Sequence, residues 1–507
     1  MLGYGKHRFR GSCQAIVGAI LLTASSGSVR AQVDPNALAE SARNAMAERR
    51  FSEAAEIYSD LAAKFPNEPT LQANLGMALH FSNRDTEAIA PLQEAALAMP
   101  SSFPAHFALG ASLSRLGRYA EAVASLRKST QIDPQHPFAH ALLGEALEAT
   151  EEYSQAATAW RALSGLDPTN PYPHAGLVRC NEELVAMAVE QLRQRDPESP
   201  YMLRFLGRTR LATAQYPSAL YLFRTALERQ PGVRAVHEAV ASVYERAGQP
   251  EWAKIERLKA ESLPATDCAE SQSAECNFLA GRFDLAPALS GALSASDLFW
   301  AARSYASLAE QSFKELASLP ESVEKLTLVA DIFASQEQFS RAADACRRAL
   351  DIGEGSGDLE RQMAELLYLA KRVEEARPLL ERFYRSDPDD ARWAAMLGNL
   401  LAGEQDYEKA VPLLESAVAR PGAPVTARLD LGRSYLALDK PQEAAEHLSA
   451  SLGLDGDGSI HYQLAQAYQR LGMREQAREA LAQYQALDAR TREQTEASAS
   501  LEITAPE

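Results

Sequence analysis

The fold is decided by residues 117–168, which read GRYAEAVASLRKSTQIDPQHPFAHALLGEALEATEEYSQAATAWRALSGLDP. Ala122 and Pro134 recur in this stretch 34 residues later, as Ala156 and Pro168. The same interval extends toward the N-terminus through two earlier proline and alanine pairs, Ala54 with Pro66 and Ala88 with Pro100. Two helices of about 12 to 14 residues and two short turns fill such a period. The period therefore predicts an array of helical hairpins.

Small residues recur in phase with the prolines, in Leu75-Gly76, Leu109-Gly110 and Leu143-Gly144. Gly or Ala is needed where two helices cross closely, and proline ends a helix because it lacks the amide hydrogen. The pattern resembles the tetratricopeptide repeat family, in which a proline closes each unit. The resemblance implies an all-α fold, a right-handed α-solenoid of tetratricopeptide hairpins, with about ten to twelve units in two arrays.

The domain organisation follows from where the period holds and where it breaks. Residues 171–199 and 264–322 depart from it. Arg303, Leu308, Leu316 and Ser322 repeat the order of Arg179, Leu184, Leu192 and Ser199, which suggests a duplicated block, with coincidence as the alternative. We predict a signal peptide at 1–31, an N-terminal array at 32–263, an irregular insert at 264–296, a C-terminal array at 297–491 and a disordered tail at 492–507.

The N-terminal segment has the features of a secretory signal. Lys6, Arg8 and Arg10 precede an apolar run that is too short to span a bilayer of about 30 Å. Val29-Arg30-Ala31 then offers small residues for cleavage before Gln32. We expect a protein exported to the periplasm with no membrane span after cleavage, and an uncleaved anchor is the alternative.

The charge is strongly acidic, with a formal net charge of -17. Binding to phosphate backbones needs a positive footprint, so we expect no nucleic-acid partner. A solvated acidic surface that keeps the protein soluble accounts for the charge.

Histidines offer no catalytic or metal site. Five of them occupy the fourth position of a unit, where the family has a bulky packing residue: His106, His140, His174, His237 and His461. Helices pack about 8 to 10 Å apart, so these side chains cannot share one zinc ion. The sequence also lacks phosphate-loop and nucleophile-elbow motifs. We predict no enzymatic activity, no cofactor and no metal, with an enzyme carrying an unrecognised site as the alternative.

Cys268 and Cys276 lie in the irregular insert, eight residues apart in a polar stretch. An exported protein meets an oxidising environment, so we predict a disulfide between them. Two free thiols, or a metal or redox role, are the alternatives.

Ligand contacts in the family come from the first helix of each unit, which lines the concave surface. The resemblance transfers this role, as predicted concave-face residues, to Met77, His80, Phe81, Phe107, Arg115 and Glu145 in the first array, and to Arg392, Asn399, Arg433, Tyr462, Gln466 and Arg470 in the second. The second set is polar and basic, which favours acidic peptides, although a solvated face is the alternative. The family's carboxylate clamp is absent, since its places hold residues such as Ala73 and Met77.

These features predict a scaffold or adaptor that binds a protein or peptide in the bacterial cell envelope. The alternative is an assembly factor for envelope secretion or polysaccharide-export machinery. The sequence identifies neither the partner nor the oligomeric state.

Overall fold

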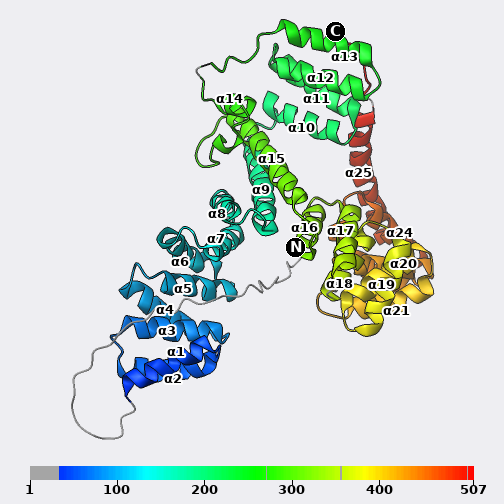
Figure 1. Cartoon of the computed structure of the whole chain (residues 1–507). Helices are drawn as coiled ribbons and strands as arrows, with labels where there is room; N and C mark the ends of the chain where they lie inside the picture. The colour runs from blue at the N-terminus through cyan, green and yellow to red at the C-terminus, as the bar shows by residue number, and fades with distance from the viewer. Residues whose placement is uncertain (1–33, 270, 354–356, 500, 507) are drawn as a thin grey trace. The chain divides into compact units, whose positions relative to one another are not determined.

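The computed structural model describes residues 34–269, 271–353, 357–499 and 501–506 (Figure 1). The predicted signal peptide lies outside these residues. All regular elements in the described ranges are helices, which confirms the all-α prediction. The described chain divides into two compact units, one ending at Glu183 and the other beginning at Leu184.

Unit 1 contains four hairpins, whose first helices begin 34 residues apart at Pro35, Pro69, Phe103 and Pro137. The hairpins are α1 (Pro35–Ala47) with α2 (Phe51–Lys64), α3 (Pro69–Phe81) with α4 (Asp85–Ala98), α5 (Phe103–Arg115) with α6 (Tyr119–Ile132), and α7 (Pro137–Ala149) with α8 (Tyr153–Leu166). The four repeat prolines each stand two residues after a second helix ends. This position fits proline, because it cannot continue a helix and also disfavours helical geometry in the residue before it.

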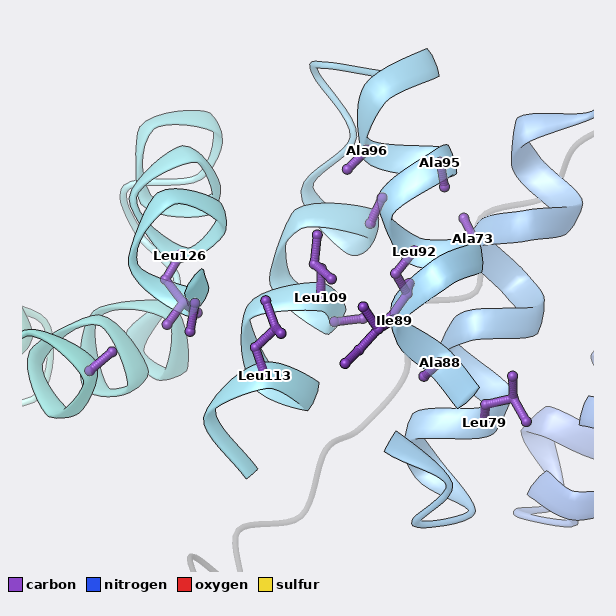
Figure 2. Packing of buried hydrophobic residues seen from close by; sticks show 14 of the residues in the cluster. Ala73, Leu79, Ala88, Ile89, Leu92, Ala95, Ala96, Leu109, Leu113 and Leu126 are labelled. Atoms are coloured by element: carbon purple, nitrogen blue, oxygen red, sulfur yellow. The ribbon is translucent and has the colours of Figure 1, made fainter. Parts of the chain in front are cut away.

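The core of unit 1 runs continuously through the stacked hairpins. Figure 2 shows Leu92, Leu109 and Leu113 among the side chains gathered between neighbouring helices, with alanines such as Ala88 where the backbones come close. Ala88 and Leu92 are fully buried. Each hairpin packs on the next, so the apolar face of one is covered by its neighbour.

Unit 2 contains seven hairpins, in which the two helices of each pair again follow one another in sequence. They are α10 (Pro200–Ala212) with α11 (Tyr216–Arg229), α12 (Arg234–Arg246) with α13 (Pro250–Ser262), α16 (Val323–Ser335) with α17 (Phe339–Ile352), α18 (Gly357–Leu369) with α19 (Val373–Ser386), α20 (Ala391–Gly403) with α21 (Tyr407–Val418), α22 (Val425–Ala437) with α23 (Pro441–Ser449), and α24 (Ser459–Arg470) with α25 (Arg474–Ala499). A short 3-10 turn, η2 (Leu452–Leu454), follows α23.

Both irregular segments are built around one long helix. These are α9 (Pro171–Arg195), of 25 residues, and α15 (Ala295–Ser318), of 24 residues. Arg179 and Arg303 each stand eight residues after the first residue of their helix. The two segments thus share a structural form as well as a sequence pattern.

The insert before α15 holds only a short helix, α14 (Ala274–Leu279), and a 3-10 turn, η1 (Phe283–Leu285). Cys268 and Cys276 are joined there by a disulfide, with their Cα atoms 5.4 Å apart. Cys180 and Cys346 are free and buried.

The C-terminal region differs from the prediction of a disordered tail at 492–507. Helix α25 continues to Ala499, since residues 488–499 contain mainly good helix formers and neither glycine nor proline. The following segment, residues 501–506, is placed against α11 and α12 of the same unit.

Candidate peptide-binding surfaces

The repeat histidines are held by intramolecular hydrogen bonds. Nε2 of His106, His140 and His174 donates to the carbonyl of the proline six residues earlier, at 3.2, 3.0 and 3.4 Å. Each bond connects the start of a first helix to the proline that closes the preceding repeat. His237 and His461 instead bond carboxylates, of Glu256 at 2.7 Å and Asp455 at 2.5 Å. All five side chains are therefore engaged in packing the array.

In unit 1, predicted concave-face residues form a network that is already satisfied within the protein. Nδ1 of the buried His80 lies 2.7 Å from Asp85 and 2.9 Å from Ser112. Arg115 reaches back from α5 to the His80 carbonyl at 2.9 Å and to the Asp85 carboxylate at 3.0 Å. Despite burial, the pKa of Asp85 is lowered, because its bond to His80 and the charge of Arg115 outweigh the desolvation of its carboxylate. His80 and Arg115 thus connect neighbouring hairpins.

The aromatic members of this set pack on other rings. The Phe81 ring lies 5.2 Å from that of Phe51, and Phe107 stacks on Phe103 at 5.4 Å. The His136 ring lies 5.0 Å from that of Phe107. The rings of both groups remain partly exposed, so each group offers an apolar contact surface.

Met77 and Glu145 complete the predicted residues of unit 1. Met77 is half-buried against the core. Burial raises the pKa of the Glu145 carboxyl to about 7, with a further contribution from the negative charge of Glu148. At neutral pH, Glu145 is therefore partly protonated.

In unit 2, hydrogen bonds join three consecutive first helices. The Tyr368 hydroxyl of α18 donates to the Asn399 carbonyl oxygen of α20 at 2.9 Å. The Asn399 amide donates in turn to the Asp430 carboxylate of α22 at 2.8 Å. The side-chain amide of the predicted Asn399 is therefore engaged in hydrogen bonds that position neighbouring repeats.

The arginines of this face are paired with acids, which corrects the expectation of a basic surface. Arg392 contacts Asp390 at 2.8 Å and Glu365 at 3.0 Å. Arg470 donates to the Leu436 carbonyl at 2.7 Å and to Asp439 at 3.1 Å. Arg433 lies 4.0 Å from Asp430 and donates to Gln463 at 3.2 Å. Intramolecular carboxylates thus offset the charge of all three predicted arginines.

Tyr462 is an exposed member of the predicted residues in unit 2. It is 45% exposed, and its ring lies 5.1 Å from that of Tyr484 in α25. Gln466, one helical turn further along α24, is half-buried. Tyr462 can therefore contact a partner without breaking an internal hydrogen bond.

A second surface, which the sequence did not predict, holds the C-terminal segment. Nη2 of Arg224 in α11 donates to the carbonyls of Thr504 and Ala505 at 3.1 and 2.6 Å. The Tyr244 hydroxyl of α12 also donates to the Thr504 carbonyl, at 2.7 Å. Ile503 packs on the apolar cluster of α11, α12 and α13. We refer to this surface, formed by Leu220, Tyr221, Arg224, Thr225 and Tyr244, as the tail groove.

Recognition in the tail groove is directed mainly at the main chain. Carbonyl groups are common to all peptides, whereas Ile503 supplies an apolar side chain. A faint signal for this site exists in the sequence, since Leu501 and Ile503 alternate with polar residues ahead of Pro506. The groove itself cannot be deduced from that pattern, because its walls lie more than 250 residues away in the chain.

Within the described residues, no group of three or more histidine, cysteine or acidic side chains is placed to hold a metal ion. Among the described helices, none combines the length and apolar character needed to cross a membrane.

Models of tetratricopeptide repeat families match at five places in the chain. One matches residues 114–180 and 333–400, a second matches 40–102 and 395–460, and a third matches 458–491. Together these matches cover more than half of the sequence.

Solved structures with repeat folds are also similar. MamA is 24% identical, with 33% of this chain and 98% of the MamA chain aligned and a TM-score of 0.29. YrrB, described as a repeat protein with an unusual peptide-binding site, is 20% identical over 32% of this chain and 86% of its own, with a TM-score of 0.28. The Cut9-Hcn1 hetero-tetramer of the APC/C is 14% identical over 90% of this chain and 94% of its own, with a TM-score of 0.30.

No curated protein sequence matches the chain. The matched ranges fall on the observed helical hairpins. The chain belongs to the tetratricopeptide repeat family.

Proposed function

We propose that this protein is a non-enzymatic scaffold that binds a protein or peptide in the bacterial cell envelope. The observation that carries the proposal is the tail groove, where paired helices hold an extended segment through its carbonyls. A surface that holds one segment in this way suits others of similar chemistry, since main-chain recognition is largely independent of sequence.

Export to the periplasm is supported by two independent features. The Cys268–Cys276 disulfide is suited to an oxidising compartment. The N-terminal sequence has the charge and apolar pattern of a secretory signal.

The test is photocrosslinking in the native envelope, with a photoreactive residue placed at Tyr462 or Tyr221. Both side chains are exposed, at 45% and 54%, and lie on the two candidate surfaces. Leu97, on the second helix α4 and 84% exposed, is the matched control position. We expect one dominant partner at Tyr462 or Tyr221 and none at Leu97, and equal capture at all three positions would contradict the proposal.

The two separate surfaces of unit 2 give a second function some support. A factor that assembles envelope machinery must hold several partners at once, which would require both surfaces. Capture of different proteins at Tyr462 and Tyr221 would favour this assembly role over a dedicated adaptor.

Export has its own test in alkylation of whole cells without reductant. The disulfide predicts that Cys268 and Cys276 resist alkylation until a reductant is added. Labelling of either cysteine in the absence of reductant would contradict an oxidised, exported protein.

A further inference from the structure

Three arginines of unit 2 gather where the repeat pattern is interrupted. Arg204 and Arg208 belong to α10, and Arg303 belongs to α15, which packs on α10. The Arg204 guanidinium carbon lies 4.5 Å from the ring centroid of Phe299. That of Arg303 lies 4.1 Å from the ring centroid of Phe278. Both also lie within 6 Å of the Trp300 ring centroid, at 5.6 and 5.1 Å.

Among the described residues, Arg204 and Arg303 have no acidic partner to match their burial. Arg204 is only 6% exposed, Arg303 is half-buried and Arg208 is exposed at the rim. Among the described residues, none of the three forms an ion pair or a hydrogen bond with another side chain. Other described arginines, such as Arg115 and Arg392, are paired with carboxylates. A buried charge without a counter-charge is costly, and the aromatic contacts offset only part of that cost.

Electrostatics within the cluster are repulsive. Burial lowers the pKa of the Arg204 and Arg303 guanidinium groups, and that of Arg303 falls to about 9 because Arg208 and Arg204 repel its charge as well. Glu275 is a nearby acid whose negative charge favours the protonated form of Arg204. It accepts a hydrogen bond from Thr266, however, and forms no ion pair with Arg204. Counted over the described residues, the cluster therefore carries an excess of positive charge.

A neutral donor beside the arginines is also unsatisfied. The indole Nε1 of Trp300 is buried and has no hydrogen-bond partner. Its ring is 1% exposed and is the one that both Arg204 and Arg303 contact. Buried donors are nearly always paired in native proteins, so this one points to a missing acceptor.

In unit 1, Arg179 and Trp160 show which acceptor can satisfy an arginine and an indole together. Arg179, the counterpart of Arg303, donates from Nε and Nη2 to the two carboxylate oxygens of Glu148, both at 3.1 Å. The Trp160 indole Nε1 donates to the same carboxylate at 2.5 Å. One carboxylate thus pairs with an arginine and accepts a hydrogen bond from an indole, and the described residues around Arg303 and Trp300 include no such group.

We propose that Arg204, Arg208, Arg303 and Trp300 form a binding site for a carboxylate group of an acidic peptide segment. The proposal rests on the proposed function, because it assigns the peptide partner a chemical character. The site lies between α10, α14 and α15. A guanidinium binds a carboxylate through paired hydrogen bonds, and the partly dry surroundings strengthen them.

The test follows the indole NMR signal of Trp300 in the full chain, assigned by its loss in the Trp300→Phe variant. The probe is a short polyglutamate peptide, compared with polyglutamine and inorganic phosphate. We expect polyglutamate to shift this signal in a saturable manner. Polyglutamine should leave it unchanged, and phosphate should bind at least about tenfold more weakly.

Charge variants provide the control. Arg208→Gln and Arg210→Gln remove the same charge from exposed positions on α10, but Arg210 instead bonds Gln215. We expect Arg208→Gln to weaken polyglutamate binding about threefold, Arg303→Gln about tenfold, and Arg210→Gln hardly at all. If Arg303→Gln fails to fold, the comparison of Arg208→Gln with Arg210→Gln still tests whether the carboxylate binds at this site.

Three results would overturn the site: an unshifted Trp300 signal, equal binding of polyglutamine or phosphate, and equal weakening by Arg208→Gln and Arg210→Gln. Failure of the site is distinguishable from failure of the proposed function. A partner captured at Tyr462 or Tyr221, together with an unshifted Trp300 signal, contradicts the carboxylate site and leaves the scaffold role standing.

Discussion

At the scale of single residues, several hairpins have a glycine in the first helix that faces a large side chain of the second. A Cβ atom built at Gly110 would lie 2.5 Å from Cγ of Leu126, and one at Gly144 would lie 2.6 Å from Cε2 of Trp160. Both facing side chains are almost fully buried, so they cannot retreat toward solvent. Glycine is therefore required here for close approach, whatever its effect on helix propensity.

We predict that Gly110→Ala destabilises the α5–α6 hairpin by about 1 to 3 kcal/mol, because the added methyl group overpacks against Leu126. Hydrogen exchange of the α5 and α6 amides measures the change. Gly165→Ala is the control, since Gly165 lies in α8 with open space around it and alanine favours helix by up to about 1 kcal/mol. Equal protection in the wild type and Gly110→Ala would refute the packing argument.

Glu145 makes the stability of the folded protein depend on pH, and the sign of this dependence follows from the pKa shift of Glu145. Its carboxyl pKa is raised from 4.5 to about 7 in the folded state, so the folded state binds more protons than the unfolded chain between these values. Stability therefore falls as pH rises through this window. Below it, both states are protonated and the group has no effect.

We predict that Glu145→Gln raises stability by about 1 to 2 kcal/mol at pH about 8 and by almost nothing at pH about 4, with partial exposure limiting the gain. Denaturant unfolding of both proteins at the two pH values measures the difference. An equal effect of the substitution at both pH values would show that Glu145 acts through packing instead of ionisation.

At the scale of elements, the turn inside a hairpin uses one residue with left-handed backbone geometry. Gly117 has φ +74°, and the non-glycine residues Glu151 and Ala214 have φ +62° and +57° at the corresponding places. Residues with a Cβ pay roughly 1 kcal/mol for this conformation. The turns are thus under mild strain wherever glycine is absent.

We predict reciprocal effects at two of these turns. Gly117→Ala should destabilise its hairpin by roughly 1 kcal/mol, while Ala214→Gly should stabilise α10–α11 by up to about the same amount. Both positions are exposed, so packing does not confound the comparison. Exchange rates of the flanking amides report the effect, and changes of the same sign in both variants would rule out backbone strain as the cause.

The repeat period allowed the hairpins to be predicted from sequence, because proline and small residues mark boundaries within a single unit. The lengths of α9 and α15 were not predictable in this way, since neither proline nor glycine occurs after Gly176 in α9 or anywhere in α15. The pairing of Arg392 with Glu365, or of Asn399 with Asp430, depends on contacts between neighbouring repeats of unit 2, whose residues lie about 30 positions apart in the sequence. The resemblance located the first-helix face, but the neutralisation of its charge required the structure.

At the scale of the whole molecule, departures from the repeat are concentrated in unit 2. It contains the disulfide, the short helix α14, the arginine cluster and the tail groove. Unit 1, by contrast, is an uninterrupted array followed by the start of α9. The disulfide, α14 and the arginine cluster therefore occur where the repeat gives way, whereas the tail groove is formed by two regular hairpins.

The C-terminal segment in the tail groove is expected to compete with peptides in solution, because a tethered segment acts at high local concentration. Deletion of residues 501–507 should free the groove. A synthetic LEITAPE peptide should then bind the truncated protein at least about tenfold more tightly than the intact chain. Isothermal titration calorimetry measures both affinities.

Within the truncated protein, Arg224→Ala should abolish binding of this peptide, since Arg224 donates to two carbonyls of the segment. Arg246→Ala removes a similar charge from the exposed surface of α12 and should leave affinity unchanged. Equal affinity of the peptide for intact and truncated chains would mean that the segment does not occupy the groove in solution. Loss of binding in both arginine variants would instead indicate attraction of the peptide by charge alone, without recognition of its main chain.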